Sequence, residues 1–208
     1  MIKVFVEGKD KFFIEAYIAF LTTNLAIPGD IDFNVIPLGG WTNLTNASNT
    51  VKENSDLGGK NILIFDADSE LNSGGFNIRK KEIEKIKAEN NLAFELFLFP
   101  DNSTNGDFES LLEMIINQKH AGVLECFSIY EECIAKYNKP NSPLVYKLPI
   151  RKSKIYSFVD AFPKSKSESK KFKQGDFFFQ NNEMWDFESS KLNPLKEFLT
   201  KELTNHKH

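Results

Sequence analysis

The chain contains few of the residues that form covalent bridges or bind soft metals. Cys126 and Cys133 are the only cysteines among 208 residues. They are seven positions apart in a predicted helix, which puts both near one face but too far apart to form a disulfide. We interpret them as reduced, structural thiols. A zinc site would need more Cys or His at ligand spacing than the sequence has.

Long hydrophobic runs are also missing. No apolar run approaches the roughly 20 residues that span a bilayer. The opening stretch, MIKVFVEGKDKFF, has charges inside its apolar run and no small-residue cleavage site, so it does not resemble a signal peptide. These features predict a cytoplasmic protein with no membrane partner, and they leave its oligomeric state open.

Several catalytic and ligand-binding motifs are absent. The sequence has no G-x-x-x-x-G-K-[ST] phosphate loop and no G-x-S-x-G nucleophile motif. Gly39-Gly40 and Gly74-Gly75 are interpreted as turn glycines, although Gly39-Gly40 could let the backbone approach a ligand. The run from Phe177 to Phe179 could stack on bases, but a core or edge strand is the preferred interpretation, and Trp185 is interpreted as a packing residue.

The sequence does contain enough apolar residues for a hydrophobic core. Its charged residues are distributed unevenly along the chain. Hydrophobic residues make up 41% of the chain, with 20 phenylalanines, and the net charge is −3. The segment from Lys147 to Lys173 holds nine Lys or Arg and two acids, so the rest of the chain is strongly acidic. This asymmetry suits an acidic metal centre beside a basic phosphate-binding surface, with a solvated loop as the alternative. Within it, the apolar-poor stretch 165–173 is predicted to be flexible.

Strand and helix patterns alternate over the first 117 residues. Strands are predicted at 2–6, 31–38, 61–65 and 93–99, and helices at 9–24, 43–54, 78–90, 107–117, 124–137 and 194–203. Such alternation predicts an α/β fold with a Rossmann-like parallel sheet of about four strands flanked by helices. We expect residues 1–120 to form this core. Residues 121–208 would form an α-rich, partly irregular, basic extension packed on it.

Acidic residues follow three of the predicted strands. Glu7 follows the first strand, Asp66 and Asp68 follow the third, and Asp107 and Glu109 follow the fourth. Because sites in open parallel sheets form outside the carboxyl ends of the strands, these groups are expected at one edge. Taken singly, they are better explained as helix-start or loop acids. Together they favour Mg²⁺ or Mn²⁺, which prefer oxygen ligands.

These motifs resemble a known family. A strand ending in V-E-G, followed by a later strand ending in D-A-D, is similar to the Toprim domain of topoisomerases, primases and a class of nucleases. The G-D-F-E stretch looks most like the nucleases of the OLD (overcoming lysogenization defect) type. The stretch WDFESSKLNPLKEFL is similar to the tail of small standalone Toprim-like bacterial proteins.

The resemblance implies roles for particular residues. Glu7 would be a metal ligand or general acid/base, Asp66 and Asp68 the metal-binding pair, and Asp107 and Glu109 the acids of a second metal. A lysine could neutralise charge on the phosphate, with Lys154 the first choice. The basic residues expected to contact nucleic acid are Lys147, Arg151, Lys152 and Lys154. The nuclease pattern departs at one position, because Lys11 stands where a second acid is usual. Asp10, one place earlier, is the candidate metal ligand there, and the sequence leaves open whether it turns toward the metals.

Three functions compete on these grounds. The leading hypothesis is a Mg²⁺- or Mn²⁺-dependent nuclease or other phosphodiester-processing hydrolase that acts on nucleic acid. The alternative is a non-catalytic Toprim-like binding module or subunit of a larger assembly, since OLD-type nucleases carry an ATPase that this chain lacks and that a separate ATPase partner could supply. A small-molecule phosphatase ranks third, because its D-x-D would be expected on the first strand.

Overall fold

Four parallel strands form the central sheet in the order β2-β1-β3-β4. The computed structural model describes residues 1–24, 26–70, 74–139 and 144–204. The strands are β1 (Ile2–Val6), β2 (Phe33–Pro37), β3 (Lys60–Asp66) and β4 (Glu95–Phe99). Helices flank the sheet, so the predicted α/β class is confirmed. The chain turns from β2 on one side of β1 to β3 on the other, which creates a switch point between the ends of β1 and β3.

The helices follow the predicted alternation with shifted boundaries. They are α1 (Asp10–Thr23), η1 (Trp41–Leu44), α2 (Ser48–Asp56), α3 (Phe76–Glu89), α4 (Phe108–Ile115), η3 (Gln118–His120), α5 (Ala121–Tyr137), α6 (Arg151–Asp160), α7 (Lys166–Lys173), η4 (Ser190–Leu192) and α8 (Asn193–Thr204). The predicted helix over 43–54 is thus a 3-10 turn followed by a shorter α-helix. No helix among the described residues is both long and apolar enough to cross a membrane.

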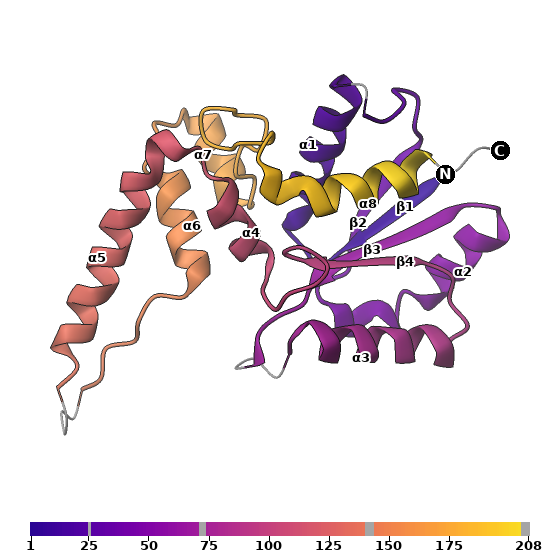
Figure 1. The fold of residues 1–208 in the computed structure, drawn as a ribbon, viewed down its shortest axis with the longest axis horizontal. Helices are drawn as coiled ribbons and strands as arrows, with labels where there is room; N and C mark the ends of the chain where they lie inside the picture. The colour runs from indigo at the N-terminus through magenta and orange to yellow at the C-terminus, as the bar shows by residue number, and fades with distance from the viewer. Residues whose placement is uncertain (25, 71–73, 140–143, 205–208) are drawn as a thin grey trace.

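The two faces of the sheet bury different sets of side chains. Val4 and Val6 point into a cluster covered by α1, α4 and α8, whereas Phe5 points into a smaller cluster covered by α2 and α3 (Figure 1). Successive strand side chains alternate between faces, so a strand apolar at nearly every position is buried on both. The central strands β1 and β3 are therefore nearly continuous apolar runs, whereas the outer strands β2 and β4 have exposed positions.

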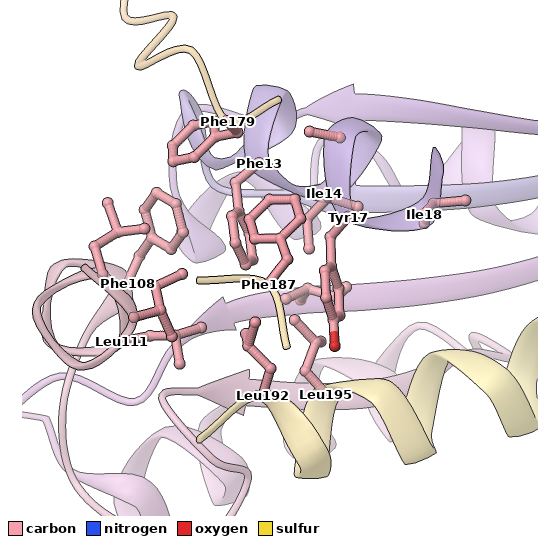
Figure 2. Packing of buried hydrophobic residues seen from close by; sticks show 14 of the residues in the cluster. Phe13, Ile14, Tyr17, Ile18, Phe108, Leu111, Phe179, Phe187, Leu192 and Leu195 are labelled. Carbon is pink, nitrogen blue, oxygen red and sulfur yellow. The ribbon is translucent and has the colours of Figure 1, made fainter. Parts of the chain in front are cut away.

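Aromatic packing holds the first cluster together next to the carboxyl edge of the sheet. The Phe13 ring of α1 lies 5.2 Å from that of Phe108 on α4 and 5.3 Å from that of Phe179, centroid to centroid. Phe187 and Leu195 close the other side of the cluster (Figure 2). Contacts of this kind contribute beyond the area that they bury. They fix the first turns of α1 and α4, both of which carry acidic residues, against the strand ends.

The C-terminal extension completes this core. Trp185 is 1% exposed, and its indole N–H donates to the carbonyl of Phe177 at 2.9 Å, which confirms the predicted packing role. Phe177 and Phe179 are buried, but the predicted strand over 177–179 is wrong. Phe178 between them has a φ of 55°, a left-handed conformation that ends any extended run.

Two other expectations for the extension are corrected. The stretch 165–173, predicted to be flexible, forms α7: Ser165 and Glu168 make a reciprocal capping box at the helix start, and Phe172 packs against Tyr156 and Phe177. Residues 151–160, for which no element was predicted, form α6 and pack on α4. The cysteines of α5 are free, as predicted, but both are exposed and so have no packing role.

Candidate functional site

The ends of β1 and β3 place two carboxylates side by side. Both strands run in the same direction, with Val6 opposite Ile64, so Glu7 and Asp66 emerge at the same edge. Oε1 of Glu7 accepts the backbone N–H of Asp66 at 3.2 Å. Oδ1 of Asp66 accepts the N–H of Phe108 at 2.8 Å, which joins the end of β3 to the start of α4. The predicted convergence of these two strand-end acids is therefore present.

Asp10 joins them from the first turn of α1. Its carboxylate accepts the N–H of Gly8 at 2.6 Å and the N–H of Glu7 at 3.2 Å, and only 5% of the residue is exposed. These bonds satisfy donors in the turn between β1 and α1 and turn the carboxylate back toward the end of β1. Sequence alone left the direction of Asp10 open. The structure brings it to the acidic group, whereas Lys11 pairs with Glu15 along the helix at 3.6 Å.

Burial and mutual repulsion raise the pKa of all three carboxyls. Burial is the largest cause for each, and hydrogen bonds from backbone N–H groups oppose it only in part. The pKa of Glu7 rises to about 7, with Asp10 and Asp68 adding repulsion. The pKa of Asp10 rises to about 6, and that of Asp66 lies well above its usual value because Glu7, Asp10 and Glu109 add to the burial. Ionisation of these carboxyls is therefore unfavourable unless a cation neutralises their charge.

A pocket of about 320 Å³ opens over these acids. Glu7, Asp10, Asp66 and Glu109 contribute its carboxylates. Gly39-Gly40, which follow β2, form part of its wall, and both have positive φ values that favour glycine. The turn thus places backbone at the wall of the pocket. The sequence had left two roles open for these glycines, a plain turn and a close approach of the backbone to a ligand.

Two lysines bring positive charge to the pocket. Lys9 lines it, and its ammonium donates to the Tyr156 hydroxyl of α6 at 2.7 Å. The Lys9 side chain crosses Gly175, where a Cβ would collide with it. Lys152 of α6 also lines the pocket, with its Nζ 3.6 Å from the Glu109 carboxylate. Sequence reasoning missed Lys9, because a lysine beside a helix start carries no signal of a partner 147 positions away.

The Asp68 carboxylate forms an ion pair with an arginine side chain. Its carboxylate lies 2.6 Å from the Arg79 guanidinium, which is 4% exposed and also pairs with Glu82 at 2.8 Å. The guanidinium lies 4.1 Å from the centre of the Trp41 ring. Asp68 is not among the residues that line the pocket. Its charge thus already has a partner, one that the sequence pattern did not indicate, and a metal-binding role for it stays a prediction.

Asp107 and Glu109 begin α4 beside the pocket, and α6 covers them. Asp107 is the N-cap of α4, where its Oδ1 accepts the N–H of Ser110 at 2.8 Å, and it lies 3.1 Å from the Arg151 guanidinium. Capping satisfies an N–H at the helix start that has no partner within the helix. Asp107 therefore acts in helix capping, and Glu109 is the member of this pair that reaches the pocket.

The basic residues of α6 face the acids of α4. Arg151 and Lys154 both pair with Glu113, at 3.5 and 3.8 Å, while Lys152 reaches the pocket. Lys147 precedes α6 and lies in a groove beside α5. Of the four residues predicted to bind nucleic acid, Lys152 is thus the one at the pocket. Lys154, which was the first choice for neutralising charge on the phosphate, forms an ion pair with Glu113.

The donor set fits a hard divalent cation in its chemistry, without forming a closed cage. Among the residues that the structure describes, no group of three or more His, Cys, Asp or Glu side chains converges closely enough to enclose a metal ion. Glu7 and Asp66 each use one carboxylate oxygen for a backbone hydrogen bond and have a second that can turn to a ligand. Mg²⁺ commonly takes only one or two carboxylates and completes its shell with water and substrate oxygens. The arrangement suits that mode of binding.

Fold and site together define an α/β protein with an acidic pocket at the switch point of a parallel sheet. Residues 1–204 match the family described as "Protein of unknown function (DUF3226)", and the chain belongs to this family. No curated protein and no solved structure shows a significant match to the chain.

Proposed function

We propose that this protein is a divalent-metal-dependent enzyme that processes phosphodiesters, most specifically a nuclease, and that the acidic pocket is its active site. One observation carries the proposal: buried Asp10 and half-buried Glu7 and Asp66, all three with raised carboxyl pKa values, meet at the sheet edge beside two lysines. Burying carboxylates together costs free energy, and a bound ligand that neutralises their charge would offset this cost. The Toprim-like order of the acids agrees with this assignment.

Each residue of the pocket has a part in this proposal. Glu7 and Asp66 would hold Mg²⁺ or Mn²⁺, and the bound cation would supply neutralisation of phosphate charge and a more acidic water. Lys9 and Lys152 would hold the phosphodiester at the rim through their ammonium groups. A proton on Glu7 competes with the cation, so metal binding should strengthen as the pH rises through about 7.

The test is calorimetric titration of Mn²⁺ and Mg²⁺ at pH 6 and pH 8, followed by incubation with single- and double-stranded DNA and RNA. We expect binding that is tighter at pH 8 and that is lost in Asp66→Asn, together with any cleavage. Asp30→Asn makes the same change at an exposed residue beside the opposite edge of the sheet and should leave both unchanged. Cleavage that persists in Glu7→Gln/Asp66→Asn would rule out the proposed active site.

Ion pairs around the pocket support a second candidate, a binding module without catalysis. Asp68, Asp107 and Glu109 each lie beside an Arg or Lys, which reduces the charge available for a second metal. Such a module would bind metal or nucleic acid as a subunit of a larger assembly, with an ATPase as a separate partner. Binding of nucleic acid without turnover, under conditions that load the metal, would favour this candidate.

A further inference from the structure

Lys9 differs from the other cations around the pocket in its partner. All three cations of α6 pair with carboxylates of α4, as Lys152 does with Glu109 at 3.6 Å. None of the ion pairs in the described part of the chain includes Lys9, although Asp10 is its neighbour in the sequence. Its ammonium donates instead to the Tyr156 hydroxyl at 2.7 Å. A neutral hydroxyl accepts one of the three N–H groups and cancels no charge, so two donors and the full charge stay available at the rim of the pocket.

Further contacts fix the direction of the Lys9 side chain. Its stem crosses Gly175, which is buried and has a φ of 96°, and any Cβ at that position would collide with the stem. The ammonium lies 5.4 Å from the centre of the Tyr156 ring. Ordering a lysine side chain costs up to about 2 kcal/mol of conformational entropy. These contacts order the side chain before any ligand binds, so a ligand that binds the ammonium loses less affinity to this cost.

Tyr156 is held by the C-terminal extension rather than by the pocket. Its ring lies 4.8 Å from that of Phe177 and 5.5 Å from that of Phe172, centroid to centroid. It stands one helical turn after Lys152 on α6, so the two side chains share a face of this helix. Tyr156 is not among the residues that line the pocket. Its hydroxyl therefore acts on the pocket through Lys9, from a position that the aromatic packing of the extension sets.

Docking of α6 gives little reason for this hydrogen bond. Ile155, Phe158 and Val159 already bury the apolar side of α6 in the main hydrophobic cluster. A hydrogen bond between two groups that water reaches adds little to such packing. An ordered ammonium without a carboxylate partner is, by contrast, suited to bind an anion beside acidic residues, because its N–H groups make charge-assisted hydrogen bonds to phosphate oxygens.

We propose that Tyr156 is a positioning residue, which holds the Lys9 ammonium as an anion subsite for one backbone phosphate of a nucleic-acid strand. The inference rests on the proposed function for the class of its ligand, and it assigns part of substrate binding to the C-terminal extension. Tyr156 acts through Lys9 and does not touch the substrate. The attraction comes from the ammonium alone, so the subsite binds phosphate without metal and can be measured apart from the metal site.

Fluorescence anisotropy of a fluorescein-labelled single-stranded DNA, in low-salt buffer with EDTA at pH 6, measures the subsite without cleavage. At pH 6 the Glu7 carboxyl, with a pKa of about 7, is mostly protonated, so it repels the strand little. Lys9→Met should weaken binding by about tenfold and make the slope of log K against log salt concentration shallower by about 0.7, the share of one phosphate contact. Tyr156→Phe keeps the ring contacts and every charge, and it should weaken binding by at least about threefold with a slope change of the same sign.

Two matched variants serve as controls. Lys11→Met removes the same charge two positions away, where Lys11 pairs with Glu15 along α1, and Tyr130→Phe removes a hydroxyl from an exposed tyrosine of α5. Both should bind the strand as the wild type does. Thermal denaturation of all four variants gives their stability. A Tyr156→Phe protein that is less stable but binds the strand normally would assign Tyr156 to docking of α6 and overturn the proposal, as would a wild type with no affinity for the strand.

Calorimetry with Mn²⁺ at pH 8 separates this inference from the proposed function. Tyr156→Phe should bind Mn²⁺ as the wild type does, because no charge or metal ligand changes. Normal Mn²⁺ binding together with strand binding that ignores Lys9→Met and Tyr156→Phe overturns the anion subsite alone. A wild type that binds no Mn²⁺, but whose strand binding falls in both variants, supports the anion subsite and overturns the metal-dependent active site alone.

Discussion

At Glu7, burial disfavours the ionised carboxylate that the proposed metal binding needs. Burial raises its pKa from 4.5 to about 7, even though the N–H of Asp66 stabilises the charged form. A carboxyl with a raised pKa contributes fully to stability below pH 4.5, and this contribution is lost as the pH rises through about 7. The free energy of unfolding should therefore fall over this window in metal-free buffer, with Asp10 and Asp66 adding to the trend.

The variant Glu7→Gln isolates this effect, because its amide oxygen can still accept the Asp66 N–H. We expect it to raise the free energy of unfolding at pH 8 by on the order of 1–3 kcal/mol relative to wild type, with no gain at pH 4. Urea denaturation at the two pH values measures the difference. An equal gain at both would mean that packing, rather than relief of buried charge, produced it.

At the level of a single helix, the start of α4 combines structural and candidate functional roles. Asp107 caps the helix, and the predicted second-metal role would use the same side chain. Asp107→Ala should lower the free energy of unfolding by about 1–2 kcal/mol, whereas Asp107→Asn should cost much less, since Asn is an equally good N-cap. Thermal denaturation of both variants gives the comparison.

Metal titration of the same pair distinguishes the two roles of Asp107. Asp107→Asn removes the charge and retains the cap, so unchanged Mn²⁺ affinity would assign the residue to helix capping alone. A clear loss of affinity without a loss of stability would instead place Asp107 in the metal site, as the sequence resemblance implied.

Helix boundaries show where local pattern was sufficient. Helices α1, α3 and α8 were predicted within a few residues, because their apolar residues recur at helical spacing and face the sheet. Helix α6 was missed, because its basic residues dominated the interpretation of that stretch while only Ile155, Phe158 and Val159 are buried. Helix α7 was missed because its capping box stabilises a helix whose apolar contact is limited to Phe172.

Over the whole molecule, the two predicted parts share one core. Leu199 of α8 is fully buried in the same cluster as Val4, Ile64 and Trp185. Leu199→Ala should therefore destabilise residues 1–120 and the extension together, by about 2–5 kcal/mol. Tryptophan fluorescence, to which buried Trp185 contributes, and far-ultraviolet circular dichroism should give one coincident transition. Glu197→Ala, at an exposed position of the same helix, should have little effect, and two separate transitions would show independent units.

The sequence by itself determined the parallel sheet and the positions of the acids along it. Strand runs, helix periodicity and residues at strand ends are local properties, and parallel strands bring their carboxyl ends to one edge whatever the details of packing. Tertiary structure alone decided which charged side chains have polar partners. Asp68 has Arg79, Lys9 has Tyr156 and Lys152 has Glu109, whereas Glu7 and Asp66 remain next to each other. Pairing and burial depend on distances between segments far apart in the chain, and no local pattern encodes those distances.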